Sequence, residues 1–404
     1  MSYQSIDKIQ SLMASTIFGY AADNKKAAGR ALGTFVESIT FYLLKTWGFE
    51  SFMAIERPLP EFANNEITHN VEFTLHGKMQ EQSIKIANYI PITSNYIKKQ
   101  ISADGLEFKH ATLLDKTRIK KNACTIATSE NIFLNAYLDN NTNKINCVSL
   151  INQPFAMFEC KRVGVEEGMK KGPQTIEKAK QGSYVARTVS SLQRIRKDDG
   201  KMYGCCFDEN GNYIIDEYCK LQREIINSDR PVLLRNFILT VGVISNHGNW
   251  FTADNMNKEL KVLAQSYDWL IFLTDSGLSQ FISDLLINPQ KEYEPVKVAF
   301  EASYSAGKST NMFTKSRINL DADVAIAKYF AKNIESIEKW FNIIAPTETS
   351  LSQLKNDLQI LSHKNFGEIY RWKQQLLKPI LQEGACIHSR RRGVRRPNML
   401  MLLG

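Results

Sequence analysis

Glu159 and Lys161 stand two positions apart at the end of an apolar run of strand length, Pro-Phe-Ala-Met-Phe-Glu-Cys-Lys-Arg, at residues 154–162. Because strand side chains alternate between faces, both charges are expected on one face. Charges at a buried strand end are costly unless something uses or neutralises them. Metal-dependent phosphodiester cleavage requires such a carboxylate to hold a divalent cation, beside a lysine that positions a water or contacts a phosphate. An ordinary ion pair is the structural alternative.

A second carboxylate, Glu37, lies within a strongly helical pattern at residues 25–47, which stops at Gly48. Its stripe of the helix is expected to be partly buried, where a carboxylate needs a cation or several hydrogen-bond donors. Glu37 is therefore a candidate to bind or orient a metal ion. An ion pair with Arg30 or Lys45 is the structural alternative.

The elements that would position these residues are a mixture of strands and helices. Strands are predicted at residues 68–75, 130–138, 154–162, 231–245 and 268–274, and helices at 25–47, 175–196 and 255–266. Beyond residue 294 the pattern is mainly helical, at 323–341 and 351–381, with a basic tail at 389–397. We expect an α/β core over residues 1–290, with a mixed central sheet flanked by helices, and a mainly helical region over residues 291–404.

Composition indicates the kind of partner and compartment. The 404 residues include 51 Lys and Arg against 42 Asp and Glu, a net charge of +9 that favours a polyanionic partner. The seven cysteines are odd in number and form no Cys-x-x-Cys pair, which favours free thiols in a reducing cytoplasm. No apolar run reaches membrane-spanning length and no signal-peptide pattern is present, so no membrane contact is expected.

The order of these elements resembles the PD-(D/E)xK nuclease superfamily, and the size and decoration are most similar to a type II restriction endonuclease. The resemblance covers residues 25–275. It rests on Arg-Ala-Leu-Gly-Thr-Phe-Val-Glu at 30–37 running to Trp-Gly-Phe at 47–49, and on Phe-Glu-Cys-Lys at 158–161 followed by Gln-Gly-Ser-Tyr at 181–184. It implies a restriction-endonuclease-like core and a Mg²⁺-dependent, sequence-specific endonuclease that cuts double-stranded DNA.

The resemblance also implies partners and supporting residues. A homodimer is expected because palindromic DNA sites mirror two-fold protein symmetry. A cognate DNA methyltransferase is expected as a genetic rather than a physical partner. Gln181, Tyr184 and Arg187 would steady the active site or contact the DNA backbone; an exposed helix face is their structural alternative.

The sequence departs from the superfamily where an acidic residue should begin the strand before Glu-x-Lys, because no Pro-Asp occurs there. If residues 130–138 pair antiparallel with the strand that carries Glu159, Glu130 falls opposite Glu159. If residues 144–151 form the hairpin partner instead, Asp139 becomes the better candidate. Glu130 is preferred, with Asp115 as a third option.

These assignments predict a site in which Glu159 and either Glu130 or Asp139 bind Mg²⁺, with Glu37 helping to bind or orient a second ion. Lys161 would position the attacking water or stabilise the transition state.

A competing motif, Ala-Ser-Tyr-Ser-Ala-Gly-Lys-Ser at residues 302–309, matches a relaxed phosphate-binding loop. No capped helix follows it and no strand ending in Asp lies downstream, so Lys308 and Lys315 are expected near DNA phosphates instead. The alternatives to a restriction enzyme are a repair or recombination nuclease of the same superfamily, a non-catalytic DNA-binding module and, third, a nucleotide-driven enzyme.

Overall fold

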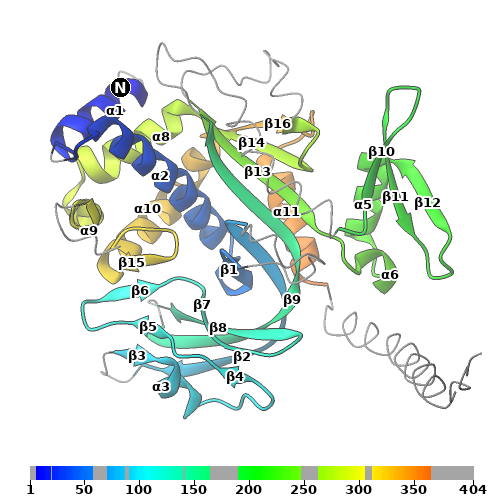
Figure 1. The fold of residues 1–404 in the computed structure, drawn as a ribbon, viewed down its shortest axis with the longest axis horizontal. Helices are drawn as coiled ribbons and strands as arrows, with labels where there is room; N and C mark the ends of the chain where they lie inside the picture. Colours follow the sequence, from blue (N-terminus) through cyan, green and yellow to red (C-terminus); the bar gives the residue numbers. More distant parts are fainter. Residues whose placement is uncertain are drawn as a thin grey trace, which may run out of the picture.

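The computed structural model describes residues 6–19, 21–57, 71–86, 91–139, 142–163, 190–246, 263–304 and 312–364. Its α-helices are α1 (Ile6–Thr16), α2 (Asn24–Thr46), α3 (Ser94–Lys98), α5 (Tyr218–Asn227), α6 (Pro231–Leu234), α8 (Asp275–Ile282), α9 (Glu294–Tyr304), α10 (Leu320–Glu338) and α11 (Leu351–Ser362). Shorter turns of helix lie at Glu50–Phe52, Ser283–Ile287 and Lys291–Tyr293. Helices flank a central mixed sheet, as the sequence predicts (Figure 1).

The central sheet has nine strands within the described ranges. They are β1 (Met53–Ile55), β2 (Phe73–Lys85), β4 (Glu107–Phe108), β7 (Cys124–Thr128), β8 (Ile132–Asp139), β9 (Lys144–Val163), β13 (Leu239–Asn246), β14 (Trp269–Leu273) and β16 (Phe341–Ala345). β13 runs parallel to β9 and β14, whereas the other pairings are antiparallel. The strands expected at 130–138 and 268–274 are confirmed as β8 and β14.

β9 is the strand around which this sheet is arranged (Figure 1). β2 pairs along one edge of it, from Phe73 opposite Phe158 to Lys85 opposite Lys144. The other edge is shared, with β8 on the first half and β13 on the second. The expected strand at 154–162 and the alternative hairpin partner at 144–151 are therefore parts of one continuous strand.

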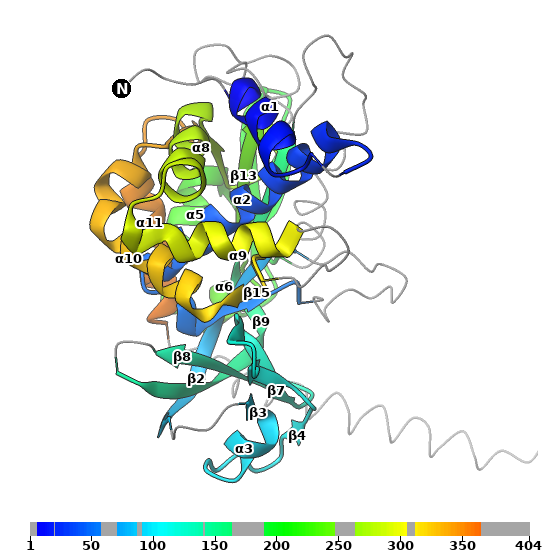
Figure 2. The same cartoon turned by 90° about the vertical axis from the view of Figure 1, so that its left-hand side faces the viewer.

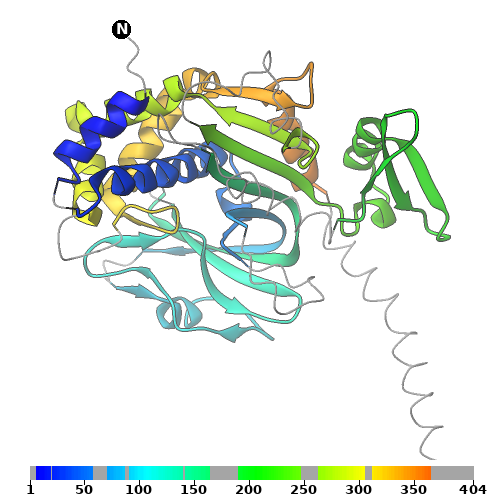
Figure 3. The ribbon, with the colours of Figure 1, turned by 45° about the horizontal axis from the view of Figure 1, so that its top comes forward.

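A smaller sheet consists of β3 (Ile92–Thr93), β5 (Thr112–Leu114), β6 (Ile119–Lys121) and β15 (Arg317–Asn319). It lies beside the β7–β8 part of the central sheet, among the cyan strands at the bottom of Figure 3. β15 pairs with β6 although about two hundred residues separate them in the chain. This pairing fixes the segment that begins at Met312 against the β-rich layer.

Helix α2 confirms the helix expected at 25–47. The Asp23 carboxylate caps its first turn by accepting the Lys26 backbone N–H. Gly48 ends it at φ +92°, a conformation that glycine adopts at little cost. Its apolar stripe packs in the largest hydrophobic core, and α9 and α10 lie on the same side of the molecule (Figure 2).

Two predicted elements are wrong in part. The helix expected at 175–196 does not extend to its end, because β10 (Gln193–Arg196) is a strand; residues 164–189 lie outside the described ranges. The strand expected at 231–245 begins as the short helix α6, and only its second part is β13. β10 pairs with β11 (Met202–Phe207), which pairs with β12 (Tyr213–Glu217), and α5 covers this small sheet beside the main body (Figure 1).

The region after residue 290 shares the main core. α9, α10 and α11 make it mainly helical, but β16 pairs with β14 in the central sheet. The largest cluster of buried apolar side chains extends from Ile6 to Leu361. The expected division at residue 290 therefore does not separate two hydrophobic cores. Among the described residues no helix has the length and apolar character needed to cross a membrane.

A buried ion-pair network ties α10 to α2 and β6. The Asp323 carboxylate, which is 0% exposed, lies 2.6 Å from the Lys120 ammonium and 3.3 Å from that of Lys45. Tyr42 donates a hydrogen bond to it at 2.9 Å. Although burial opposes ionisation, Lys120 and Lys45 hold the pKa of Asp323 well below its ordinary value. The network joins elements that lie far apart in the sequence.

Replacing Asp323 by Asn should lower the free energy of unfolding by about 3–5 kcal/mol, because the buried Lys120 charge loses its partner. The matched control is Asp321→Asn, whose 55% exposed side chain pairs with Arg118 on the surface. That change should cost less than about 1 kcal/mol. Urea unfolding followed by circular dichroism measures both; equal, small losses would contradict this account of the network.

Candidate functional site

Two carboxylates meet where β2 begins and β9 nears its end. Phe73 pairs with Phe158, so the residue before β2, Glu72, lies beside Glu159. The Lys161 ammonium lies between them, 2.8 Å from a Glu159 oxygen and 3.1 Å from Glu72 Oε1. The Glu159–Lys161 contact confirms that these side chains share one face of the strand. The Cys160 backbone N–H donates to Glu72 Oε2 at 3.4 Å.

A second lysine approaches the same place from the turn before β15. The Lys315 ammonium lies 2.9 Å from Glu56 and 3.4 Å from Glu37. It also lies 3.8 Å from Glu72 Oε1, the oxygen that Lys161 contacts. The resulting carboxylate–lysine cluster consists of Glu37, Glu56, Glu72, Glu159, Lys161 and Lys315.

Local backbone structure explains why these side chains converge. Glu56 follows β1 directly, and its N–H donates to the Glu72 carbonyl at 3.1 Å, which extends the β1–β2 ladder by one pair. Glu56 has φ +49°, an unusual conformation for a residue with a side chain. Glu37 comes from the middle of α2, on the helix that packs against β9.

The members of the cluster differ widely in exposure. The Glu159 side chain is 0% exposed and that of Glu72 is 8% exposed, whereas Lys161 is 25%, Glu37 is 26% and Glu56 is 53% exposed. The carboxylates thus range from fully buried Glu159 to half-exposed Glu56.

Burial and neighbouring charges shift the pKa values of the groups in the cluster. Burial and the charge of Glu159 raise the pKa of Glu72 from its ordinary 4.5 to about 7, against the opposing effect of Lys161. Burial likewise raises the pKa of Glu37, with Lys315 opposing it. Burial would lower the pKa of both lysines, but the carboxylates around them raise the pKa of Lys161 and of Lys315. Both ammonium groups therefore stay charged.

The predicted partners of Glu159 do not reach it. β8 pairs with residues 144–151 rather than with the end of β9, so Glu130 lies near Asn152, whose amide donates to its backbone carbonyl. Seven residues separate Asn152 from Glu159, about 23 Å at the rise of a strand. Asp139 is further still, opposite Lys144. The prediction that Glu130 or Asp139 lies beside Glu159 is wrong. β9 is one continuous strand, and β8 pairs with its first half, whereas Glu159 lies near its end.

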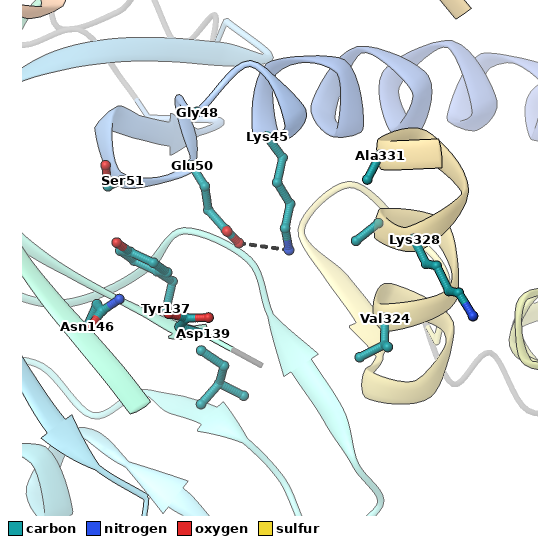
Figure 4. Close-up of a pocket in the computed structure, with 12 residues that line it drawn as sticks. Lys45, Gly48, Glu50, Ser51, Tyr137, Asp139, Asn146, Val324, Lys328 and Ala331 are labelled. Carbon is teal, nitrogen blue, oxygen red and sulfur yellow. Dashed lines mark ion pairs between the residues drawn. The ribbon is translucent and has the colours of Figure 1, made fainter. Parts of the chain in front are cut away.

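Asp139 instead lines a separate hollow of about 620 Å³ between α10, the β8–β9 hairpin and the end of α2 (Figure 4). Figure 4 shows the Lys45 and Glu50 side chains pointing toward each other across this hollow, 3.0 Å apart. Asp115, the third option, accepts the backbone N–H groups of Thr117 and Ile119 in a tight turn. Neither aspartate contributes to the carboxylate–lysine cluster.

Other predicted site residues lie elsewhere or outside the described ranges. Gln181, Tyr184, Arg187 and Lys308 are all outside them. Glu37 does belong to the cluster, but its cation is Lys315 rather than Arg30 or Lys45. Lys45 pairs with Glu50 and Asp323 in the buried network.

Glu72, Glu56 and the ion-pairing role of Lys315 were not predicted from the sequence. Glu72 had a signal: it is the charged residue of the Val-Glu-Phe-Thr-Leu run at residues 71–75, inside the strand predicted at 68–75. The strand expected to carry the acidic partner was the one that precedes Glu159 in sequence, whereas β2 is the neighbour of Glu159 in space. Lys315 carried no such signal, because a tertiary contact alone brings it to the cluster.

Mg²⁺ prefers oxygen ligands, and the carboxylates of Glu72 and Glu159 match that preference. Within the part of the chain that the structure describes, however, no three acidic, histidine or cysteine side chains are grouped as a metal site. Lys161 stands between the two carboxylates. The donor set fits a hard divalent cation provided that the partly exposed Lys161 side chain moves aside.

In comparisons with known proteins, no family model, no curated protein and no solved structure matches this chain.

The raised pKa of Glu72 predicts a pH-dependent stability. Protonated Glu72 stabilises the fold fully below pH 4.5, and this contribution is lost as the pH rises through about 7. One such group gives the unfolding free energy a slope of up to about 1.4 kcal/mol per pH unit. Glu72→Gln should remove that slope.

Urea unfolding between about pH 4.5 and 7.5 measures the difference between wild type and Glu72→Gln. Glu130→Gln, which alters an exposed carboxylate, should follow the wild type. Parallel curves for wild type and Glu72→Gln would show that Glu72 does not titrate in this window.

Proposed function

We propose that this protein is a Mg²⁺-dependent endonuclease that hydrolyses phosphodiester bonds of double-stranded DNA, of the type II restriction class. The observation that carries the proposal is the meeting of Glu72 and Glu159 on adjacent antiparallel strands, with Lys161 between them. Two carboxylates and a partly exposed lysine, gathered at a strand end, are suited to metal-assisted phosphodiester cleavage.

The order of the elements supports the same proposal. A helix with Glu37 is followed by β1, by β2 with Glu72 at its start, by β9 with Glu159 and Lys161, and later by β13. This order is similar to that of the PD-(D/E)xK superfamily, where an acidic residue begins the strand beside Glu-x-Lys. In this chain Glu72 takes that place, and residues 86–143 form an insertion between β2 and β9.

Each residue has a distinct role in this proposal. Glu72 and Glu159 would hold the divalent ion. Glu37 would be linked to this site indirectly, because Lys315 contacts both Glu37 and Glu72. Lys161 is long enough to swing from between the carboxylates toward the attacking water or the phosphate. A bound Mg²⁺ would supply charge neutralisation at the phosphate and a water of lowered pKa.

Charge gives a reason for the metal requirement. When all groups are ionised, the four carboxylates outnumber the two ammonium groups of the cluster by two. An excess of negative charge repels a DNA phosphate. A phosphodiester would therefore approach only after a divalent ion has balanced the cluster, although the net charge of +9 attracts DNA to the protein as a whole.

Supercoiled plasmid incubated with the protein and Mg²⁺ should give discrete fragments, and EDTA should abolish them. Lys161→Ala, Glu72→Gln and Glu159→Gln should each lower the cleavage rate by at least about 100-fold, because each removes a group at the reacting phosphate. Lys161→Ala should still bind DNA without Mg²⁺. The matched controls are Glu130→Gln and Asp139→Asn, which should cut as the wild type does.

The outcomes separate the alternatives. A smear with Mg²⁺ would favour a nonspecific repair nuclease, and cleavage that needs ATP would favour a nucleotide-driven enzyme. DNA binding without any cleavage would favour a non-catalytic module in which the Lys161 ion pairs are permanent. Equal loss of binding and cleavage in folded Lys161→Ala would refute the role given to Lys161.

A further inference from the structure

Lys315 is more buried than Lys161 and contacts one more carboxylate of the cluster. Its side chain is 9% exposed, against 25% for Lys161, and it contacts Glu37, Glu56 and Glu72. Those three carboxylates come from α2, the end of β1 and the start of β2. Lys315 therefore bridges three elements with one charge.

The backbone around Lys315 is fixed on both sides. The Asn122 amide donates to the Lys315 carbonyl at 3.0 Å, and the Asn122 N–H donates to the Ser316 carbonyl at 2.9 Å. Two residues earlier, Phe313 is buried and its ring lies 6.0 Å from that of Phe35 on α2. These contacts fix the backbone from which the Lys315 side chain extends.

Charge balance limits what else the cluster can hold. Phosphodiester cleavage sites with two metals place two divalent ions about 3.5–4 Å apart, bridged by carboxylates. Here Lys315 already lies among Glu37, Glu56 and Glu72, at distances of 2.9 to 3.8 Å. The excess of two negative charges that remains equals the charge of one divalent ion.

The geometry points to Lys315 as a fixed cation that stands in for a second divalent ion, so that this site takes one divalent ion per chain. This inference rests on the proposed function, since it concerns the same cluster. Lys315 is a positioning residue: it holds Glu37, Glu56 and Glu72 together, and it leaves Glu72 and Glu159 for the single ion. Lys161 is the lysine whose side chain moves aside when the ion binds.

Calorimetric titration of the full chain with Mn²⁺, without DNA, tests the inference. Wild type should bind one ion. Lys315→Met, which keeps the length of the side chain and removes its charge, should bind two. Lys315→Arg keeps the charge and should bind one. Lys161→Met should still bind one ion, at least about tenfold more tightly, because the competing ammonium is gone.

Lys201→Met is the surface control, since Lys201 is 63% exposed and pairs with Glu217 far from the cluster, and it should match the wild type. Two ions in wild type, no ion in wild type, or one ion in folded Lys315→Met would each overturn the inference. If Lys315→Met does not fold, the wild-type and Lys315→Arg stoichiometries decide. One bound ion with no DNA cleavage would uphold the inference and overturn the proposed function; cleavage with two ions would do the reverse.

Discussion

The constraint on which this structure depends is the repulsion among the carboxylates that it gathers in one partly buried place. Glu159 is 0% and Glu72 is 8% exposed, and the charge of Glu159 raises the free energy of ionising Glu72. Lys161 and Lys315, which both contact Glu72 Oε1, offset that cost. Removing either lysine would leave buried negative charge without a partner, so the cluster is held as a unit rather than as separate ion pairs.

The fold supplies the cluster by bringing four other segments to the end of β9. α2 contributes to both charged centres: Glu37 contacts Lys315 in the cluster, while Tyr42 and Lys45 contact Asp323 in the buried network. α10 and β6 are secured by that second network, and β6 in turn pairs with β15 beside Lys315. The two charged centres are therefore connected through helix α2 and through the β6–β15 pairing.

The two lysines of the cluster differ in how exposed their side chains are. The Lys315 side chain is 9% exposed and its backbone carbonyl accepts a hydrogen bond from Asn122, whereas the Lys161 side chain is 25% exposed. A rigid cation at one end and a movable one at the other leave a single position where an incoming charge can be accommodated. Glu72, whose oxygen both lysines contact, lies between these positions. This asymmetry connects the packing of the segment before β15 to the chemistry proposed for β9.

The sequence by itself determined the elements with strong local patterns. Helix α2 with Glu37, the strand with Glu159 and Lys161 on one face, β8 and β14 all follow from periodicity and end signals that depend on neighbouring residues. Tertiary structure alone decided that β2 rather than β8 lies beside the end of β9, and that the turn before β15 delivers Lys315. Pairing partners depend on the burial of surfaces distant in sequence, and a charge reveals its role only when the opposing charges have been placed.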